Sequence, residues 1–113
     1  MDIKTIRAAE FSFCKNLISV IIPSTIISIG CEAFEHNNLT EVIIKSKLVK
    51  IDKNTFNNYS LLKTITIPNT IIDIDEYAFD RCRSLSKVII TGGESEYLRN
   101  YFENLGITNI IIK

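Results

Sequence analysis

At 113 residues the chain is long enough for one domain at most, and an apolar content of 46% is normal for a folded protein, which argues against disorder. Its 13 basic and 13 acidic side chains cancel, so charge gives no reason to expect binding to nucleic acid or to an anionic membrane. Every apolar run falls short of the roughly 18–20 residues that span a bilayer.

A phenylalanine recurs every 22 or 23 residues along the chain. A fixed period of this length is typical of a solenoid, in which one supersecondary unit stacks on the next. We divide this single domain into a partial first repeat (residues 1–10), regular repeats (11–90) and a helical capping repeat with a last strand (91–113). The recurring positions are Phe11, Phe34, Phe56, Phe79 and, more loosely, Phe102.

The chain starts partway through a unit. No polar capping segment precedes Ile3, so apolar rungs at this end of the stack are expected to be open. The sequence leaves three alternatives. Residues 1–10 fold over as an irregular cap, the chains associate end to end, or the chain is truncated from a longer array.

Each unit then carries the spacing Leu-x-x-Val-x-Ile, which predicts a short β-strand. Its last two apolar positions alternate with period two and so point to one face. Stacking five such strands would make a parallel sheet. The three ladders are Leu17, Leu39, Leu62, Leu85, Ile107; Val20, Val42, Ile65, Val88, Ile110; and Ile22, Ile44, Ile67, Ile90, Ile112.

The second half of each unit reads as a turn followed by a short helical piece. Pro23 and Pro68 stand just after the expected strands, where a missing N–H ends a ladder at little cost. Asp52 and Asp75 occupy equivalent places where a carboxylate can cap the following turn. Further apolar positions in this half are Ile26, Leu48, Ile71 and Ile29, Ile51, Ile74.

These residues carry a family resemblance. The stretch LLKTITIPNTIIDIDEYAFDRCRSLSKVII (61–90) closely resembles leucine-rich repeats of the BspA-like subclass, whose units read roughly L-x-x-I-x-I-P-x-x-V-x-x-I-G-x-x-A-F-x-x-C. The likeness is good over residues 11–90 and weaker to Lys113. The second unit departs from the pattern, because it lacks one residue between Phe34 and Leu39 and has Lys45 in place of proline.

The resemblance implies a leucine-rich-repeat solenoid. Such a fold is right-handed and β-dominated α/β, with one short parallel strand per turn of 22–23 residues and short helical turns. It also implies binding of proteins or surfaces rather than one reaction.

The last unit looks different from the others. A turn at Thr91-Gly92-Gly93 precedes residues 94–105, where an apolar stripe predicts an amphipathic helix with a core-facing side. An aromatic cofactor box is the alternative explanation of the stripe. A strand at Thr108–Ile112 would then form the fifth rung. The stripe consists of Tyr97, Leu98, Tyr101, Phe102 and Leu105.

The candidate binding surface lies between the strand anchors, on the outward face of the sheet. The residues expected there form one row, the sheet-face row: Ile21, Ile43, Thr66, Ile89 and Ile111. A solvated row is normally polar, so four isoleucines indicate a contact surface. A bias of the genome toward isoleucine codons, or a neighbouring domain that covers the row, would also explain them.

A second row on the same face, the polar row, would form the rim of that surface: Ser19, Glu41, Thr64, Lys87 and Asn109. A further apolar set, Ile27, Val49 and Ile72, is expected to lie next to the core, and the alternative is that it lines another face.

Residues suited to catalysis or metal binding are few. His36 is the only histidine and has no placed Ser, Cys or carboxylate partner, so we expect no catalytic, cofactor or metal site. Stacked charges, Lys50 beside Asp73 and Lys53 beside Glu76, are read as structural, as are the stacked carboxylates of Asp52 and Asp75. The three cysteines, Cys14, Cys31 and Cys82, do not make a disulfide framework, since Cys14 and Cys82 lie three repeats apart, and they are expected to be free thiols.

The sequence therefore predicts a non-catalytic protein–protein interaction module that binds a protein partner through its sheet face. One alternative is a cell-surface or adhesion fragment, which glycans at Asn38 or Asn58 would favour. Another is a structural protein that self-associates through its open N-terminal end or the sheet-face row. Free thiols and the missing signal peptide favour an intracellular location.

Overall fold

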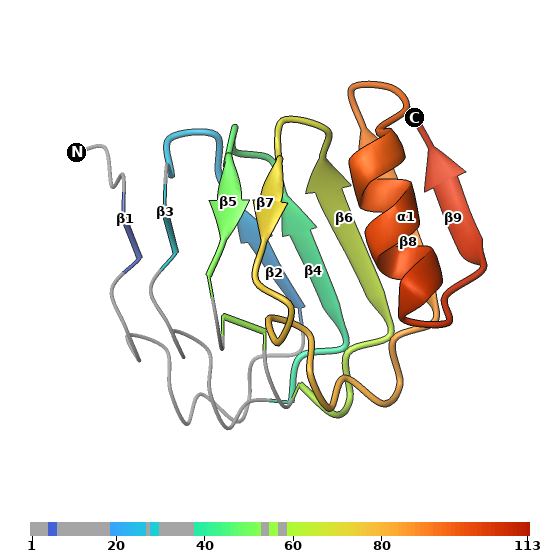
Figure 1. Ribbon diagram of the computed structural model, residues 1–113. Helices are drawn as coiled ribbons and strands as arrows, with labels where there is room; N and C mark the ends of the chain where they lie inside the picture. The colour runs from blue at the N-terminus through green and yellow to red at the C-terminus, as the bar shows by residue number, and fades with distance from the viewer. Residues whose placement is uncertain (1–4, 7–18, 27, 30–37, 53–54, 57–58) are drawn as a thin grey trace.

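The chain folds into two layers of short strands that alternate along the sequence (Figure 1). The structure is a computed structural model that describes residues 5–6, 19–26, 28–29, 38–52, 55–56 and 59–113. The first layer is one sheet in the order β2 (Ser19–Ile22), β4 (Glu41–Ile44), β6 (Thr64–Pro68), β8 (Lys87–Thr91), β9 (Asn109–Ile112). The second layer holds the pairs β1 (Thr5–Ile6) with β3 (Ser28–Ile29) and β5 (Lys50–Ile51) with β7 (Asp73–Ile74), followed by helix α1 (Glu96–Asn104).

All strand pairs among the described residues are parallel, and the register follows the sequence repeat. Val42 faces Ile65, Ile65 faces Val88, and Val88 faces Ile110, so equivalent positions of successive units stand side by side. A chain that returns to the same sheet in the same direction once per unit is a β-solenoid. The predicted repeat architecture is therefore confirmed, including a strand in the last unit and a helix before it.

The core lies between the two layers. Phe56, Phe79 and Phe102 are buried there in a column, with ring centroids 5.2 Å and 5.3 Å apart in succession. The inward side chains of the sheet meet those of the short strands, and together they form one continuous cluster. Because each unit contributes equivalent residues, each is covered by its neighbours. The ladder positions Leu17, Phe11 and Phe34 lie outside the described residues.

The expectation that Val49 and Ile72 lie next to the core was wrong. Their side chains are 53% and 68% exposed, whereas Leu48 and Ile51 beside Val49 are buried. The two buried residues are spaced by three, so the backbone changes direction between them and both Val49 and Lys50 point to solvent. Ile27, the third member of that set, lies outside the described residues.

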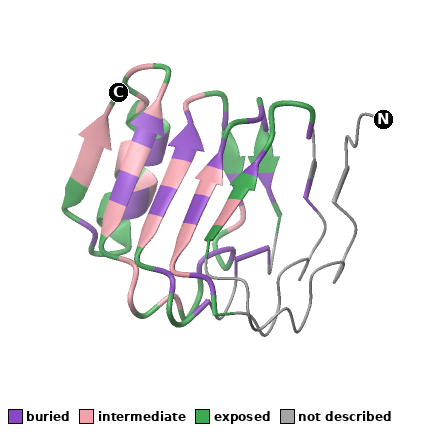
Figure 2. Ribbon diagram, turned by 180° about the vertical axis from the view of Figure 1, so that it is seen from behind, coloured by how far each residue is buried: buried purple, intermediate pink, exposed green. Residues whose placement is uncertain are grey.

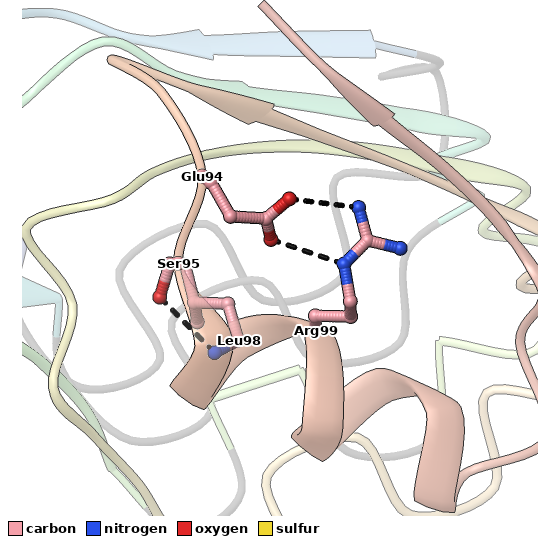
Figure 3. A network of polar contacts seen from close by, with 4 residues as sticks. All are labelled: Glu94, Ser95, Leu98 and Arg99. Carbon is pink, nitrogen blue, oxygen red and sulfur yellow. Dashed lines mark hydrogen bonds and ion pairs between the residues drawn. The ribbon is translucent and has the colours of Figure 1, made fainter.

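Helix α1 begins and ends inside the predicted range of 94–105. The Ser95 side chain accepts a hydrogen bond from the Leu98 N–H at 3.2 Å and so caps the N-terminus (Figure 3). Glu94, expected inside the first turn, precedes this cap and accepts two hydrogen bonds from the Arg99 guanidinium, at 3.0 and 2.9 Å. That contact lowers the pKa of Glu94.

The apolar stripe of α1 is narrower than the sequence predicted. Leu98 and Phe102 are fully buried and Tyr101 is half-buried, which confirms that the stripe faces the core. Tyr97 and Leu105, however, are 40% and 45% exposed. Leu105 lies at the C-cap rather than within the helix, and Tyr97 lies at the edge of β7.

Two tyrosine hydroxyls join α1 to that edge. The Ile74 N–H donates to the Tyr97 hydroxyl oxygen at 2.7 Å, and the Tyr101 hydroxyl donates to the Asp75 carbonyl at 3.1 Å. Burial raises the pKa of Tyr101, which keeps its hydroxyl protonated and able to donate. The helix thus supplies the hydrogen bonds that a further short strand would have made.

The turns agree in part with the sequence expectation. Pro23 follows β2, whereas Pro68 is the last residue of β6. The Asp75 side chain accepts from the Tyr77 N–H at 2.9 Å and caps its turn as predicted. The Asp52 carboxylate contacts the Lys50 ammonium at 3.3 Å, and Asn54, the residue equivalent to Tyr77, lies outside the described residues.

Candidate interaction surface

The outward face of the five-stranded sheet carries both rows that the sequence singled out. In the view from behind, β4, β6 and β8 show bands of buried and half-buried residues in alternation (Figure 2). The buried bands point to the core, and the half-buried bands form the outer face. This alternation is what a sheet with one covered face should show.

The sheet-face row runs straight across the sheet. Backbone register places Ile21 opposite Ile43, Ile43 opposite Thr66, and so on through Ile89 to Ile111. Ile21 is 54% exposed, and the other four side chains are half-buried. Neighbouring strands stand about 4.8 Å apart, so the side chains touch along the row and leave a continuous, partly apolar strip at the surface.

The polar row lies beside it in the same register. Glu41 faces Ser19 on one side and Thr64 on the other, and Lys87 lies between Thr64 and Asn109. In each strand the polar residue precedes the row residue by two positions, so both point to the same face. The structure therefore places Glu41, Thr64 and Lys87 next to the strip. Their role in binding stays a prediction.

The described part of the second layer shows a smaller apolar surface at residues that the sequence analysis expected next to the core. Val49 and Ile72 are adjacent, since the Ile72 N–H donates to the Val49 carbonyl at 2.8 Å. Both are more than half exposed. The three-residue spacing of the buried Leu48 and Ile51 contained the signal, because two inward residues at that spacing leave only outward positions between them.

A cavity of about 290 Å³ opens where the last regular unit meets the helical one. Its apolar lining comes from Phe79, Leu85, Leu105 and Ile107, and its charged lining from Glu76, Asp80, Arg81 and Arg83. This cavity was not predicted from the sequence, because it arises where the helical unit replaces a regular turn.

The Cys82 thiol also lines this cavity and is free, as predicted. It donates a hydrogen bond to the Phe56 carbonyl at 3.0 Å. Burial raises the pKa of Cys82 to about 11, so the thiol stays protonated at neutral pH and is a poor nucleophile. Cys14 and Cys31 lie outside the described residues.

The stacked charges are arranged only partly as expected. Lys50 stands opposite Asp73 in the β5–β7 pair, but the ion pair that Lys50 makes is with Asp52. Lys53 and His36 lie outside the described residues. Within the described ranges, no three His, Cys, Asp or Glu side chains gather as a metal site would require, and no helix has the length and apolar character needed to cross a membrane.

Comparison with known families agrees with the repeat geometry. Residues 3–113 match the family model described as BspA type leucine rich repeat region, in six copies. The chain therefore belongs to the BspA-type leucine-rich-repeat family. Repeats of this class generally serve protein interaction and are generally not enzymes. No curated protein and no solved structure matched the chain.

Proposed function

We propose that this protein is a non-catalytic interaction module that binds a protein partner through the outer face of its five-stranded sheet. The observation that carries the proposal is the sheet-face row, in which four of the five positions are isoleucine and the most exposed side chain, Ile21, is 54% accessible. A sheet face that contacts only solvent is normally polar, whereas apolar residues in register across five strands are typical of a contact surface.

The composition around the row fits a contact surface. Protein interfaces combine an apolar centre with a polar rim. Here the isoleucines supply the centre, and Glu41, Thr64 and Lys87 supply a rim with both charge signs. A partner that buries the strip would leave these polar groups at its margin, where they keep contact with water and add orientation more than affinity.

The scaffold also favours binding by preorganisation. The row residues are held in a hydrogen-bonded sheet whose other face is buried in its central strands, at Val42, Ile65 and Val88. β-Branched isoleucine has few side-chain rotamers to lose. Binding therefore has a small ordering cost, which leaves more of the contact energy as affinity.

The test compares two pairs of substitutions with the same chemistry on the two layers. Ile43→Lys with Ile89→Lys changes the sheet-face row, and Val49→Lys with Ile72→Lys changes the exposed apolar residues of the second layer. Each variant and the unchanged chain would be immobilised and exposed to the same extract of the source cells, and the captured proteins quantified by mass spectrometry.

We expect a protein captured by the unchanged chain to be lost with the sheet-face variant and kept with the second-layer variant. Circular dichroism and thermal melting should show that both variants fold. Retention by the sheet-face variant, or loss with both variants alike, would contradict the proposed site.

A further inference from the structure

Strand β9 is the outermost strand of the five-stranded sheet in the described part of the chain, and it pairs there only with β8. The Lys113 N–H donates to the Ile90 carbonyl at 2.8 Å, on the β8 side. Backbone groups of successive strand residues point in alternate directions, so those of Ile112 and Ile110 point away from β8. The Ile110 N–H donates a hydrogen bond to the Thr108 carbonyl at 3.1 Å. The Ile112 N–H and the carbonyls of Ile110 and Ile112 remain available at this edge.

The side chains of β9 are also less covered than those of the preceding strand. Val88 and Ile90 of the preceding strand are fully buried, at 0% exposure each. Their equivalents in β9, Ile110 and Ile112, are only half-buried. The core side of the last rung therefore lacks the neighbour that every interior rung has, and one more strand beside it would cover both isoleucines.

The two layers differ in whether the backbone groups at this end of the stack are hydrogen-bonded. In the second layer, the hydroxyls of Tyr97 and Tyr101 satisfy the backbone groups of Ile74 and Asp75, so the edge of β7 is closed. In the first layer β9 lacks two of the usual devices that protect an edge, since residues 109–112 include no proline and no charged side chain. A regular, apolar, open edge invites pairing with another strand.

We propose that β9 joins two copies of this chain into a dimer by antiparallel pairing about a twofold axis at Ile111. Identical edges related by twofold symmetry can pair only antiparallel. Ile111 then faces Ile111 of the partner subunit. The Ile112 N–H donates to the carbonyl of Ile110 of the partner subunit, and the symmetric bond forms on the other side of the axis.

Charge and side-chain chemistry agree with this register. Asn109 stands opposite Lys113 of the partner subunit, so no like charges meet across the junction. Ile110 stands opposite Ile112 of the partner subunit on the core side, where both side chains are half-buried in the single chain. On the outer side, the two sheet-face rows join end to end at Ile111. This contact is made by the edge of β9, which shares only Ile111 and Asn109 with the surface proposed for a protein partner.

The test is the oligomeric state of the chain, measured by sedimentation equilibrium over a concentration series. We expect a reversible monomer–dimer equilibrium. Ile112→Pro should abolish the dimer, because it removes the N–H that crosses the junction and that makes no bond to β8. Melting curves would show that this variant still folds. Ile43→Lys with Ile89→Lys should dimerise as the unchanged chain does, which separates this proposal from the proposed function.

A charge exchange tests the register itself. Asn109→Lys places lysines opposite each other at two symmetric points and should weaken the dimer about tenfold. Adding Lys113→Glu to the same chain converts both pairs to opposite charges and should restore the dimer. The proposal is overturned by a strictly monomeric chain at about 1 mM, the weak end of specific association. It is equally overturned by open-ended oligomers, by a dimer that survives Ile112→Pro, or by charge variants that leave the dimer unchanged.

Discussion

The five-stranded sheet and the layer of short strands are made by the same repeat, yet they have different secondary structure in the last unit. The sheet continues its pattern without change, because β9 pairs with β8 in the register that relates all earlier strands. The second layer stops its strands at β7 and continues as α1. The difference teaches that the sheet layer sets the register of the stack, while the second layer tolerates a change of secondary structure.

The reason lies in how many contacts fix each layer. A strand of four or five residues has two inward side chains and several ladder bonds, so a shift of one residue would turn its apolar face to water. β5 and β7 are two residues long, and each holds a single inward isoleucine, Ile51 in β5 and Ile74 in β7. A helix with two buried residues and two tyrosine hydroxyls can replace such a strand.

Removing the anchor of the helix should have the largest effect on this comparison. Phe102→Ala deletes a fully buried ring that packs against Phe79 with centroids 5.3 Å apart. We expect the free energy of unfolding to fall by about 3–5 kcal/mol, measured by urea denaturation. Leu105→Ala is the control, since that side chain is 45% exposed and its loss should change little. Equal losses in both variants would show that α1 is not anchored by its buried face.

A second prediction concerns the junction between the regular and the helical unit, where Cys82 lies. Its pKa is raised from 9.0 to about 11 by burial, so the fold favours the neutral thiol. The resulting stability is fully present below pH 9 and is lost as the pH rises toward 11. Because one pKa unit corresponds to about 1.4 kcal/mol and the thiol is partly exposed, the loss should be on the order of 1–2 kcal/mol.

Urea denaturation at pH 8 and at pH 10.5 measures this loss. Cys82→Ala supplies the control, because it keeps every other titrating group and should lose less stability over the same interval. The same decline in both proteins would mean that Cys82 is as accessible to water as in the unfolded chain.

The smallest of these effects should come from the two hydroxyls that close the β7 edge. Tyr97→Phe and Tyr101→Phe each remove one hydrogen bond to the backbone and keep the ring. We expect each to lower the free energy of unfolding by about 0.5–1.5 kcal/mol. Hydrogen exchange of the Ile74 amide should become faster in Tyr97→Phe and stay unchanged in Tyr101→Phe. Unchanged exchange in both would contradict the role given to Tyr97.

The sheet could be predicted from the sequence because its signal is redundant. Val20, Val42, Ile65, Val88 and Ile110 recur at nearly constant spacing, and in parallel strands that spacing fixes the register. The outward positions of the sheet-face row then follow from the period of two. The family comparison supports the same repeat over residues 3–113.

The second layer was less predictable, because its inward residues are spaced by three. Leu48 and Ile51 both point inward, so the backbone changes direction between them, and neither a strand nor a helix period describes Val49. The cavity beside Cys82 was unpredictable for another reason. Its shape depends on how helix α1 packs against the turn that contains Cys82, and the sequence of one segment does not determine that packing.

The spacing of the rungs gives the sheet face a definite length. Five strands at about 4.8 Å place Ile21 and Ile111 roughly 19 Å apart along the row. An α-helix covers that distance in about 13 residues, and its side chains on one face recur every 4.5–6 Å, close to the spacing of the rungs. An extended strand repeats one face about every 6.8 Å and falls out of step within two rungs. The spacing of the sheet-face row therefore matches the side chains of a helix lying across the strands better than those of a strand in the same position.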